Sequence, residues 1–132
     1  MFTHARLGHY VPVTWLTHGL DFVLFGMEPR GYHLTSIAFH AADAVLLYLL
    51  CCRLGTGAPL VAALFFAVHP LRVESVAWVT ARRDVVCGFF VLLCVHAYVS
   101  ASHRSGRARV SWLAGAIALF VLALLSKGLA MA

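Results

Sequence analysis

The chain has 132 residues, of which 62% are hydrophobic and 11% are charged, and its formal net charge is +5. Soluble domains average about 45–50% apolar and about 25% charged residues. The composition therefore excludes a disordered chain, a coiled coil and an ordinary soluble enzyme domain, and it indicates a membrane protein. The length allows a few membrane spans and is too short for a large aqueous domain.

The first predicted element is an amphipathic helix over residues 10–28, started by Pro12 and ended by Gly26 and the turn at 29–31. Its apolar residues recur at helical spacing, and its polar residues fall on the other side. The apolar set is Val13, Leu16, Leu20, Val23, Leu24 and Met27, and the polar set is Thr14, Thr17, His18 and Asp21. This pattern is typical of a helix that lies in the membrane interface. The alternative is a tilted span that turns its polar face against neighbouring helices.

Four apolar stretches then predict membrane spans, at residues 33–53, 55–69, 85–102 and 110–127. The second is short and begins with Gly55, Gly57 and Pro59, whereas a straight span needs about 20 residues. The predicted fold is an all-α polytopic membrane protein with about four transmembrane helices and an N-terminal interfacial amphipathic helix. Residues 1–132 form one partial membrane domain, with no signal peptide at the start.

The loop charges set the predicted orientation. Residues 103–109 carry three arginines and no acid, so the positive-inside rule places this loop in the cytoplasm. The opposite face then holds the interfacial helix, residues 69–84 and Lys127. That face is also basic, so the rule is only weakly obeyed there. Basic residues kept beside carboxylates on that face indicate a site rather than a topology signal.

Residues 69–84 are the richest segment for chemistry. They carry three cations and two carboxylates at the expected membrane surface: Arg72, Arg82, Arg83, Glu74 and Asp84. Arginine makes bidentate contacts with phosphate that lysine cannot make, so this set suits the phosphate group of a lipid substrate. The alternative is an ordinary interfacial loop whose arginines contact lipid phosphates nonspecifically.

Ionisable groups also fall inside the predicted spans. His33, His40 and Asp43 share one helical stripe, which either borders a substrate cavity or forms a satisfied polar pair that fixes packing. His96 stands alone in its span, where a packing hydrogen bond is the simpler role. The spacing of His and Cys residues predicts no metal site, and the scattered arginines do not indicate nucleic-acid binding.

Three runs of the sequence resemble a known family. They are YVPVTWLTHGLD at 10–21, LFGMEPRGYHL at 24–34, and AALFFAVHPLRVESVAWV at 62–79, which is followed by Arg82, Arg83 and Asp84. Together they are similar to the membrane part of the transmembrane and tetratricopeptide-repeat O-mannosyltransferases and their bacterial relatives. That family belongs to the type C glycosyltransferase superfamily.

The resemblance implies a helical membrane enzyme that moves a sugar from a polyprenyl-phosphate carrier to an acceptor, such as a protein, on the non-cytoplasmic side. It assigns substrate binding to residues on the outer face: His69, Arg72, Arg82, Arg83, His33 and Lys127. The cations would neutralise the phosphate of the carrier. Glu74 and Asp84 are the candidate catalytic carboxylates, and they could orient the arginines or the acceptor. No cofactor is implied.

The chain also departs from the family pattern. The family is expected to carry a first span and an acidic first outer loop that supplies the general base, and these have no counterpart before Pro12. The tetratricopeptide repeats and later spans are missing too, and Asp21 is a weak substitute for the base. We therefore expect a fragment or shortened relative that is inactive alone. Because the family has bacterial relatives, we expect the membrane to be a bacterial inner membrane.

Two other functions fit the same sequence. One is a small non-catalytic membrane protein that serves as an assembly or scaffold subunit through helix packing. The other is a transporter or proton-relay element built on His33, His40, Asp43 and His96. The first predicts arginines that splay toward lipid headgroups, and the second predicts that its four residues line one wet path.

Overall fold

The computed structural model describes residues 11–70 and 81–127, and the regular elements in these two stretches are all helices. In chain order they are α1 (Pro12–Phe25), α2 (Pro29–Arg53), α3 (Pro59–Val68), α5 (Arg82–Ser102) and α6 (Gly106–Ser126). Three of them, α2, α5 and α6, are long and apolar enough to cross a membrane. The predicted all-α membrane fold is thereby confirmed.

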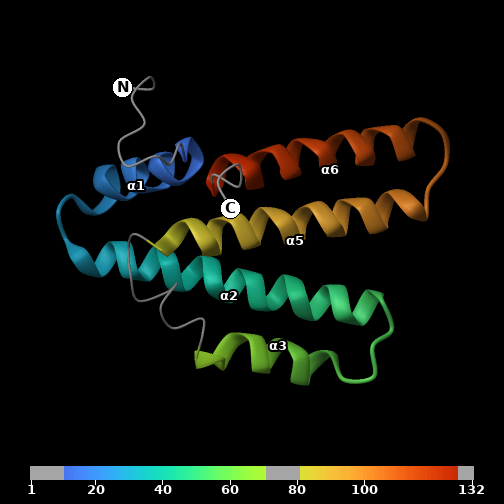
Figure 1. Cartoon of the computed structure of the whole chain (residues 1–132), viewed down its shortest axis with the longest axis horizontal. Helices are drawn as coiled ribbons and strands as arrows, with labels where there is room; N and C mark the ends of the chain where they lie inside the picture. The colour runs from blue at the N-terminus through green and yellow to red at the C-terminus, as the bar shows by residue number, and fades with distance from the viewer. Residues whose placement is uncertain (1–10, 71–80, 128–132) are drawn as a thin grey trace.

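The long helices lie side by side in a row. Figure 1 shows α2 and α5 in the middle, α3 outside α2, and α6 outside α5, in agreement with the helix pairs that are in contact. Helix α1 packs beside the first part of α2, where it also contacts α5 and α6. We call the end of the bundle at which α2 and α5 begin and α6 ends the cluster end, because polar side chains gather there. The opposite end, where α2 and α5 finish and residues 103–105 connect α5 to α6, is the loop end.

The stretch expected to be the second span is only partly helical. Helix α3 covers ten residues, Pro59–Val68, which is about 15 Å of helix against an apolar bilayer core of about 30 Å. The residues before it form turns, with Gly55 at a φ of +69°. At the far end, His69 precedes Pro70 and is extended, since the helical region is disfavoured for a residue before proline. The described part of the chain thus has three helices of spanning length and one shorter apolar helix.

The three long helices begin earlier than the apolar stretches do. Helix α5 begins at Arg82, where the apolar run begins only at Val85, and α6 begins at Gly106. Three other helices begin with a proline, which suits the first turn of a helix because its missing N–H would be unpaired there. As a consequence, Arg82, Arg83 and Asp84 stand on the first turn of α5 rather than in a loop.

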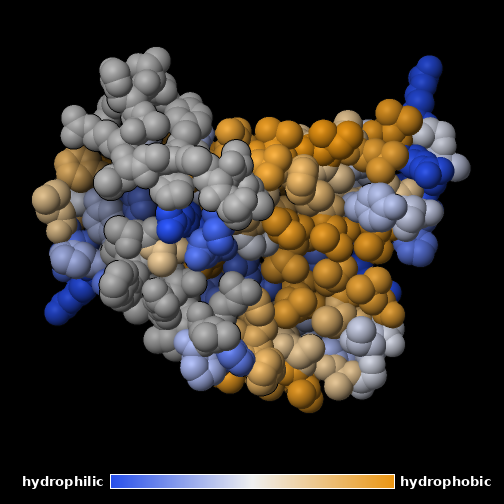
Figure 2. Space-filling model, in the orientation of Figure 1, coloured by the Kyte–Doolittle hydropathy of each residue, from blue (hydrophilic) through white to orange (hydrophobic). Residues whose placement is uncertain are grey.

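Polar side chains lie inside the bundle and large apolar side chains lie outside it. The buried polar residues are Thr14, Asp21, Ser36, Asp43, Arg82 and Ser126, whereas Val23 and Met27 are 79% and 85% exposed. Figure 2 shows a continuous hydrophobic surface over the long helices, with hydrophilic residues toward both ends. Such a distribution is favourable in lipid and unfavourable in water. The chain is therefore an integral membrane protein.

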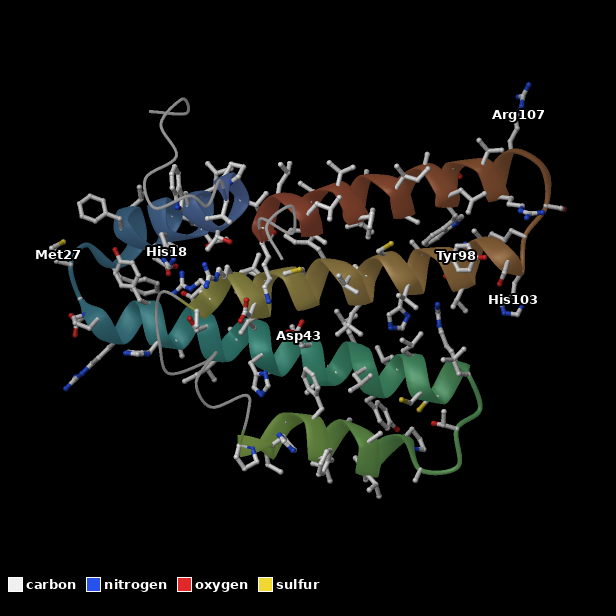
Figure 3. All side chains as sticks on the ribbon, in the orientation of Figure 1. His18, Met27, Asp43, Tyr98, His103 and Arg107 are labelled. Carbon is white, nitrogen blue, oxygen red and sulfur yellow. The ribbon has the colours of Figure 1, made fainter. Side chains whose placement is uncertain are left out.

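Small residues bring the helices close together. Helices α5 and α6 bury alanines where they pack, among them Ala97, Ala101, Ala116 and Ala123. Between α2 and α5 the small residue is Gly88, which lies against the carboxylate of Asp43, the residue labelled between these helices in Figure 3. A Cβ atom on Gly88 would stand 3.1 Å from Asp43 Oδ2. The glycine thus makes room for a buried carboxylate.

Replacing Gly88 by leucine should destabilise the bundle, because the new side chain would push α5 away from Asp43. We expect the free energy of unfolding to fall by about 1–3 kcal/mol, the range for overpacked cores. The matched control is Gly115→Leu on α6, where an added Cβ atom meets nothing within 4 Å. Thermal melting of the purified chain in detergent, followed by helical circular dichroism, measures both. Equal melting points for the two variants would contradict the prediction.

Candidate functional site

A buried ion pair lies at the cluster end. The guanidinium of Arg82, at the start of α5, contacts the carboxylate of Asp21 on α1 through Nη1 and Oδ2, and both side chains are shielded from solvent. Its Nε donates to Ser36 Oγ at 3.0 Å, and its Nη2 donates to the backbone oxygen of Tyr32, both on α2. One side chain therefore joins the start of α5 to two helices, α1 and α2, that lie far earlier in the sequence.

The carboxylate of Asp21 is satisfied on both oxygens. While Oδ2 faces Arg82, Oδ1 accepts a hydrogen bond from Thr35 Oγ1 at 2.9 Å. The ring of Tyr32 lies 5.8 Å from the Arg82 guanidinium carbon, and its hydroxyl donates to the backbone oxygen of Gly26 at 2.9 Å. His18 stacks on Tyr32 from α1 and points toward this group in Figure 3. We call these six residues the polar cluster: His18, Asp21, Tyr32, Thr35, Ser36 and Arg82.

The polar cluster holds His18 in its neutral form. Burial lowers the pKa of His18 below its usual 6.5, the positive charge of Arg82 lowers it further, and Asp21 opposes the shift. Near neutral pH the imidazole is therefore uncharged, and it adds no second positive charge beside Arg82.

A second group of charges lies next to the polar cluster, nearer to the surface. Lys127 Nζ is 3.1 Å from Asp84 Oδ1, and Arg83 Nε is 3.9 Å from the same oxygen. All three side chains are partly exposed, with 49% for Lys127, 41% for Arg83 and 31% for Asp84. We call them the surface ion group. With two cations and one carboxylate, the group keeps a net positive charge where an anion can reach it.

The position of Lys127 depends on a contact between the two ends of the described chain. Thr14 Oγ1 on α1 donates to the backbone oxygen of Ser126 at 2.7 Å, in a buried hydrogen bond. Ser126 is the last residue of α6, so this bond fixes where the helix ends and where Lys127 follows. Helix α1 therefore supports both the polar cluster and the surface ion group.

The structure brings together some of the predicted site residues. Arg83, Asp84 and Lys127 meet in the surface ion group, whereas Arg82 is buried and taken up by Asp21. His33 is half-buried on α2, and His69 follows α3, with its ring 4.8 Å from that of Phe65 in an edge contact. Arg72 and Glu74 lie outside the described residues.

Asp21 has a structural role at the site that the sequence does not predict. The sequence shows Asp21 in a polar stripe with Thr14 and His18 on an otherwise apolar helix. The sequence predicts that this stripe lies on the side of an interfacial helix away from its apolar seam. In the structure the stripe faces the bundle, because Thr14 and Asp21 are buried and Leu16 and Leu20 are exposed. The polar face thus lies against neighbouring helices, as the alternative expects, but α1 has 14 residues and is shorter than a span.

Two histidines within the long helices, His40 and His96, make packing contacts. His40 Nε2 lies 3.1 Å from the backbone oxygen of Ala67 on α3, and His96 Nε2 lies 2.9 Å from that of Leu46 on α2. Each ring thus bonds a backbone oxygen of a different neighbouring helix. This geometry favours the packing role, and it gives no support to a continuous proton path through these residues.

The comparisons with known proteins find relatives of one kind. The chain is 35% identical over 105 residues to protein O-mannosyl-transferase tmtc2 of Xenopus laevis, an alignment that covers 78% of this chain and 13% of the relative. It is 37% identical over 91 residues to TMTC3 of Mus musculus, covering 67% of this chain and 10% of the relative. It is 33% identical over 138 residues to TMTC4 of Homo sapiens, covering 89% of this chain and 19% of the relative.

Other comparisons add nothing to this. No family model matches the chain, and no solved structure matches it. The chain spans between 10% and 19% of the length of the curated relatives described above.

Removing either partner of the buried ion pair should destabilise the bundle strongly. Asp21→Leu leaves a buried guanidinium without its counter-charge, and Arg82→Met leaves a buried carboxylate, at a cost of about 3–5 kcal/mol each. The double variant should lose much less than the sum of the two single losses, because neither charge then remains. Thermal melting of wild type, the two single variants and the double variant in detergent gives the double-mutant cycle. Additive losses would show that the two side chains do not depend on each other.

The stability should also depend on pH through His18. The pKa of His18 is lowered in the folded chain, so the unfolded chain binds the proton more readily. The contribution of neutral His18 to the free energy of unfolding is therefore present above pH 6.5 and is lost as the pH falls below it. We expect the melting temperature to drop between about pH 7 and pH 5, and to drop less in His18→Gln. The matched control is His103→Gln, an exposed histidine at the loop end. An identical pH profile for wild type and His18→Gln would contradict the prediction.

Proposed function

Because the chain belongs to the family of the TMTC O-mannosyl-transferases, we propose that it forms part of the donor site of a glycosyltransferase. It matches a short stretch of each of these relatives. The donor in this proposal is a sugar carried on a polyprenyl phosphate, and the acceptor is a protein. The observation that carries the proposal is the surface ion group, a set of charges with net positive charge beside an apolar, lipid-facing bundle.

The chemistry of the donor fits this position. A polyprenyl-phosphate sugar has an apolar chain, which needs lipid or apolar helices, and a phosphate, which needs cations at the membrane surface. Arg83 and Lys127 are the cations that the described residues place there, and both are accessible. His33, His69 and Arg72 remain proposed ligands by resemblance to the family. In this proposal, Arg82 does not bind the phosphate itself but holds α5 so that Arg83 faces outward.

The carboxylates at this end are proposed to orient cations rather than to act as bases. Asp21 is ion-paired with Arg82, and Asp84 is ion-paired with Lys127. Each carboxylate is held against a cation, which suits it to orient that cation. A general base would then come from elsewhere, with Glu74 as the candidate that lies outside the described residues. We therefore propose that this stretch alone does not turn over substrate.

The proposed face of action is the non-cytoplasmic side. The surface ion group lies at the cluster end, and residues 103–109, the short loop with three arginines and its continuation into α6, lie at the other end of α5. The positive-inside rule assigns the basic loop to the cytoplasm. The relatives compared above come from frog, mouse and human, so the expectation of a bacterial inner membrane stays a prediction.

A second candidate function is that of a non-catalytic scaffold subunit. The observation that favours it is the complete burial of Arg82, one of the arginines of the family-like block, in contacts that hold helices together. Arg82 does not splay toward lipid headgroups, although the scaffold function predicts from the sequence that it would, so the support for that function is this packing role alone. A scaffold needs such contacts and needs no affinity for a sugar donor. The two candidates therefore differ in one measurable property, which is donor binding.

Donor binding is measured on the purified full chain in detergent. The probe is a polyprenyl-phosphate mannose, and native mass spectrometry counts the lipid molecules retained. We expect the double variant Arg83→Gln/Lys127→Gln to bind at least about tenfold more weakly, since two cations near the phosphate are lost. The matched control is Arg30→Gln, an exposed arginine at the same end outside the surface ion group, which should bind as wild type does. A polyprenol without phosphate should not be retained. If wild type does not retain the probe, the donor proposal is wrong and the scaffold function is favoured.

A further inference from the structure

The loop end carries a cavity that the proposed donor site does not use. It has a volume of about 550 Å³ and lies between α2, α5 and α6. Most of its wall is apolar, with Leu46 and Leu49 from α2, Leu93 from α5, and Trp112 and Leu119 from α6. Its volume falls within the range of about 300–1,000 Å³ that is common for sites of small ligands. Because it opens on a lipid-facing bundle, its natural occupant is an apolar chain.

A second, polar cavity adjoins the apolar one. It has a volume of about 430 Å³, and its wall includes Arg53, Ser100, His103 and Arg104. Arg53 and Ser100 line both cavities, so the two share a boundary at the end of α2. Together they form a space that is apolar along the helices and cationic at its mouth. We call it the loop-end groove.

Two arginines are held at the mouth of the loop-end groove by protein contacts. Arg53 Nη1 donates to Ser100 Oγ at 3.0 Å, which connects the last turn of α2 to α5. The guanidinium carbon of Arg104 lies 4.5 Å from the ring of Trp112, a distance typical of a cation–π contact. Trp112 is also part of the apolar wall. The positions of both cations are thus fixed relative to the apolar cavity.

Within residues 11–70 and 81–127, no carboxylate lies at the loop end beside these arginines. The sequence has five acidic residues, and none falls between Arg53 and Pro59 or beyond Asp84. Asp21, Glu28 and Asp84 belong to the cluster end, and Asp43 lies between α2 and α5 near Gly88. The fifth, Glu74, lies outside the described residues. Among the described residues the loop end therefore holds cations alone, so an anion from outside the chain can supply the counter-charge. Arginine binds phosphate through paired hydrogen bonds, which makes a phosphate group the matching anion.

We propose that the loop-end groove binds one anionic phospholipid of the membrane leaflet at that end, with its phosphate at Arg53 and Arg104 and an acyl chain in the apolar cavity. Charge complementarity selects an anionic lipid over a neutral one, and the apolar wall selects a lipid over a free anion. By the loop charges this is the cytoplasmic leaflet, where anionic lipids are common. The site lies at the opposite end of the bundle from the surface ion group and does not depend on the proposed transferase function.

The charge part of the proposal is tested by lipid binding to the full chain in detergent. Native mass spectrometry compares phosphatidylglycerol with phosphatidylcholine, and wild type should retain one phosphatidylglycerol in preference. Arg53→Gln/Arg104→Gln should weaken this binding at least about tenfold. The matched control is Arg107→Gln/Arg109→Gln, which removes the same charge from residues outside both cavities; Arg107 points away from the bundle in Figure 3. Equal losses in both double variants would show general attraction to basic residues and would overturn the proposal, as would equal retention of phosphatidylcholine.

The apolar part is tested with a variant that leaves every charge in place. Leu49 lines the apolar cavity but is 46% exposed, so Leu49→Trp can narrow the groove without crowding a closed core. It should weaken phosphatidylglycerol binding several-fold, whereas Leu60→Trp on the exposed side of α3 should not. Inorganic phosphate at millimolar concentration should not displace the lipid. Full displacement by phosphate, or binding that is unchanged in Leu49→Trp, would reduce the groove to a simple anion site and refute the lipid assignment.

Discussion

The contact between Arg82 and Asp21 is the interaction on which the described structure depends most. It is buried, it joins α5 to α1, and it brings Ser36 and the backbone of Tyr32 on α2 into the same network. In a surrounding of low dielectric constant, neither charge is tolerable without the other, so the three helices can pack only in the arrangement that pairs them. The next two residues of α5, Arg83 and Asp84, are then carried to the surface, where Lys127 meets them. A structural ion pair thereby fixes the geometry of an accessible one.

The polar interior follows from the solvent around the helices. Lipid is as apolar as a leucine side chain, so burying leucine between helices gains little, while hydrogen bonds and close contacts between small residues gain more. The described helices follow this principle, with Thr14, Ser36 and Asp43 inside and Leu16, Val23 and Met27 outside. The same principle explains the roles of His40 and His96, whose rings bond backbone oxygens of neighbouring helices.

The sequence predicts the helices well because their signals are local. Long apolar runs, prolines at helix starts and glycines at turns predict α2, α5 and α6, and the family-like blocks predict the relatives that were found. The orientation of α1 could not be read locally: an amphipathic stripe indicates two faces but does not say whether the polar one meets water or protein. What decides it is Arg82, which lies 61 residues further along the chain. The sequence predicts a longer apolar helix at 55–69 than α3, which covers Pro59–Val68, for a different reason. Hydropathy does not register the turns around Gly55 or the effect of Pro70 on His69.

The cations at the two ends of the bundle contact different kinds of partner. At the cluster end, Arg82 is neutralised by Asp21, and Lys127 and Arg83 share Asp84, so a phosphate arriving there has to compete with a carboxylate. At the loop end, Arg53 and Arg104 contact a hydroxyl and an aromatic ring, which hold their positions without reducing their charge. Cations paired with a carboxylate suit a ligand that must bind and leave, as the donor in a transfer reaction does. Cations held by neutral groups suit a ligand that stays, such as a structural lipid. The groups that the cations contact therefore distinguish the proposed reaction site from the proposed lipid site on one small helical bundle.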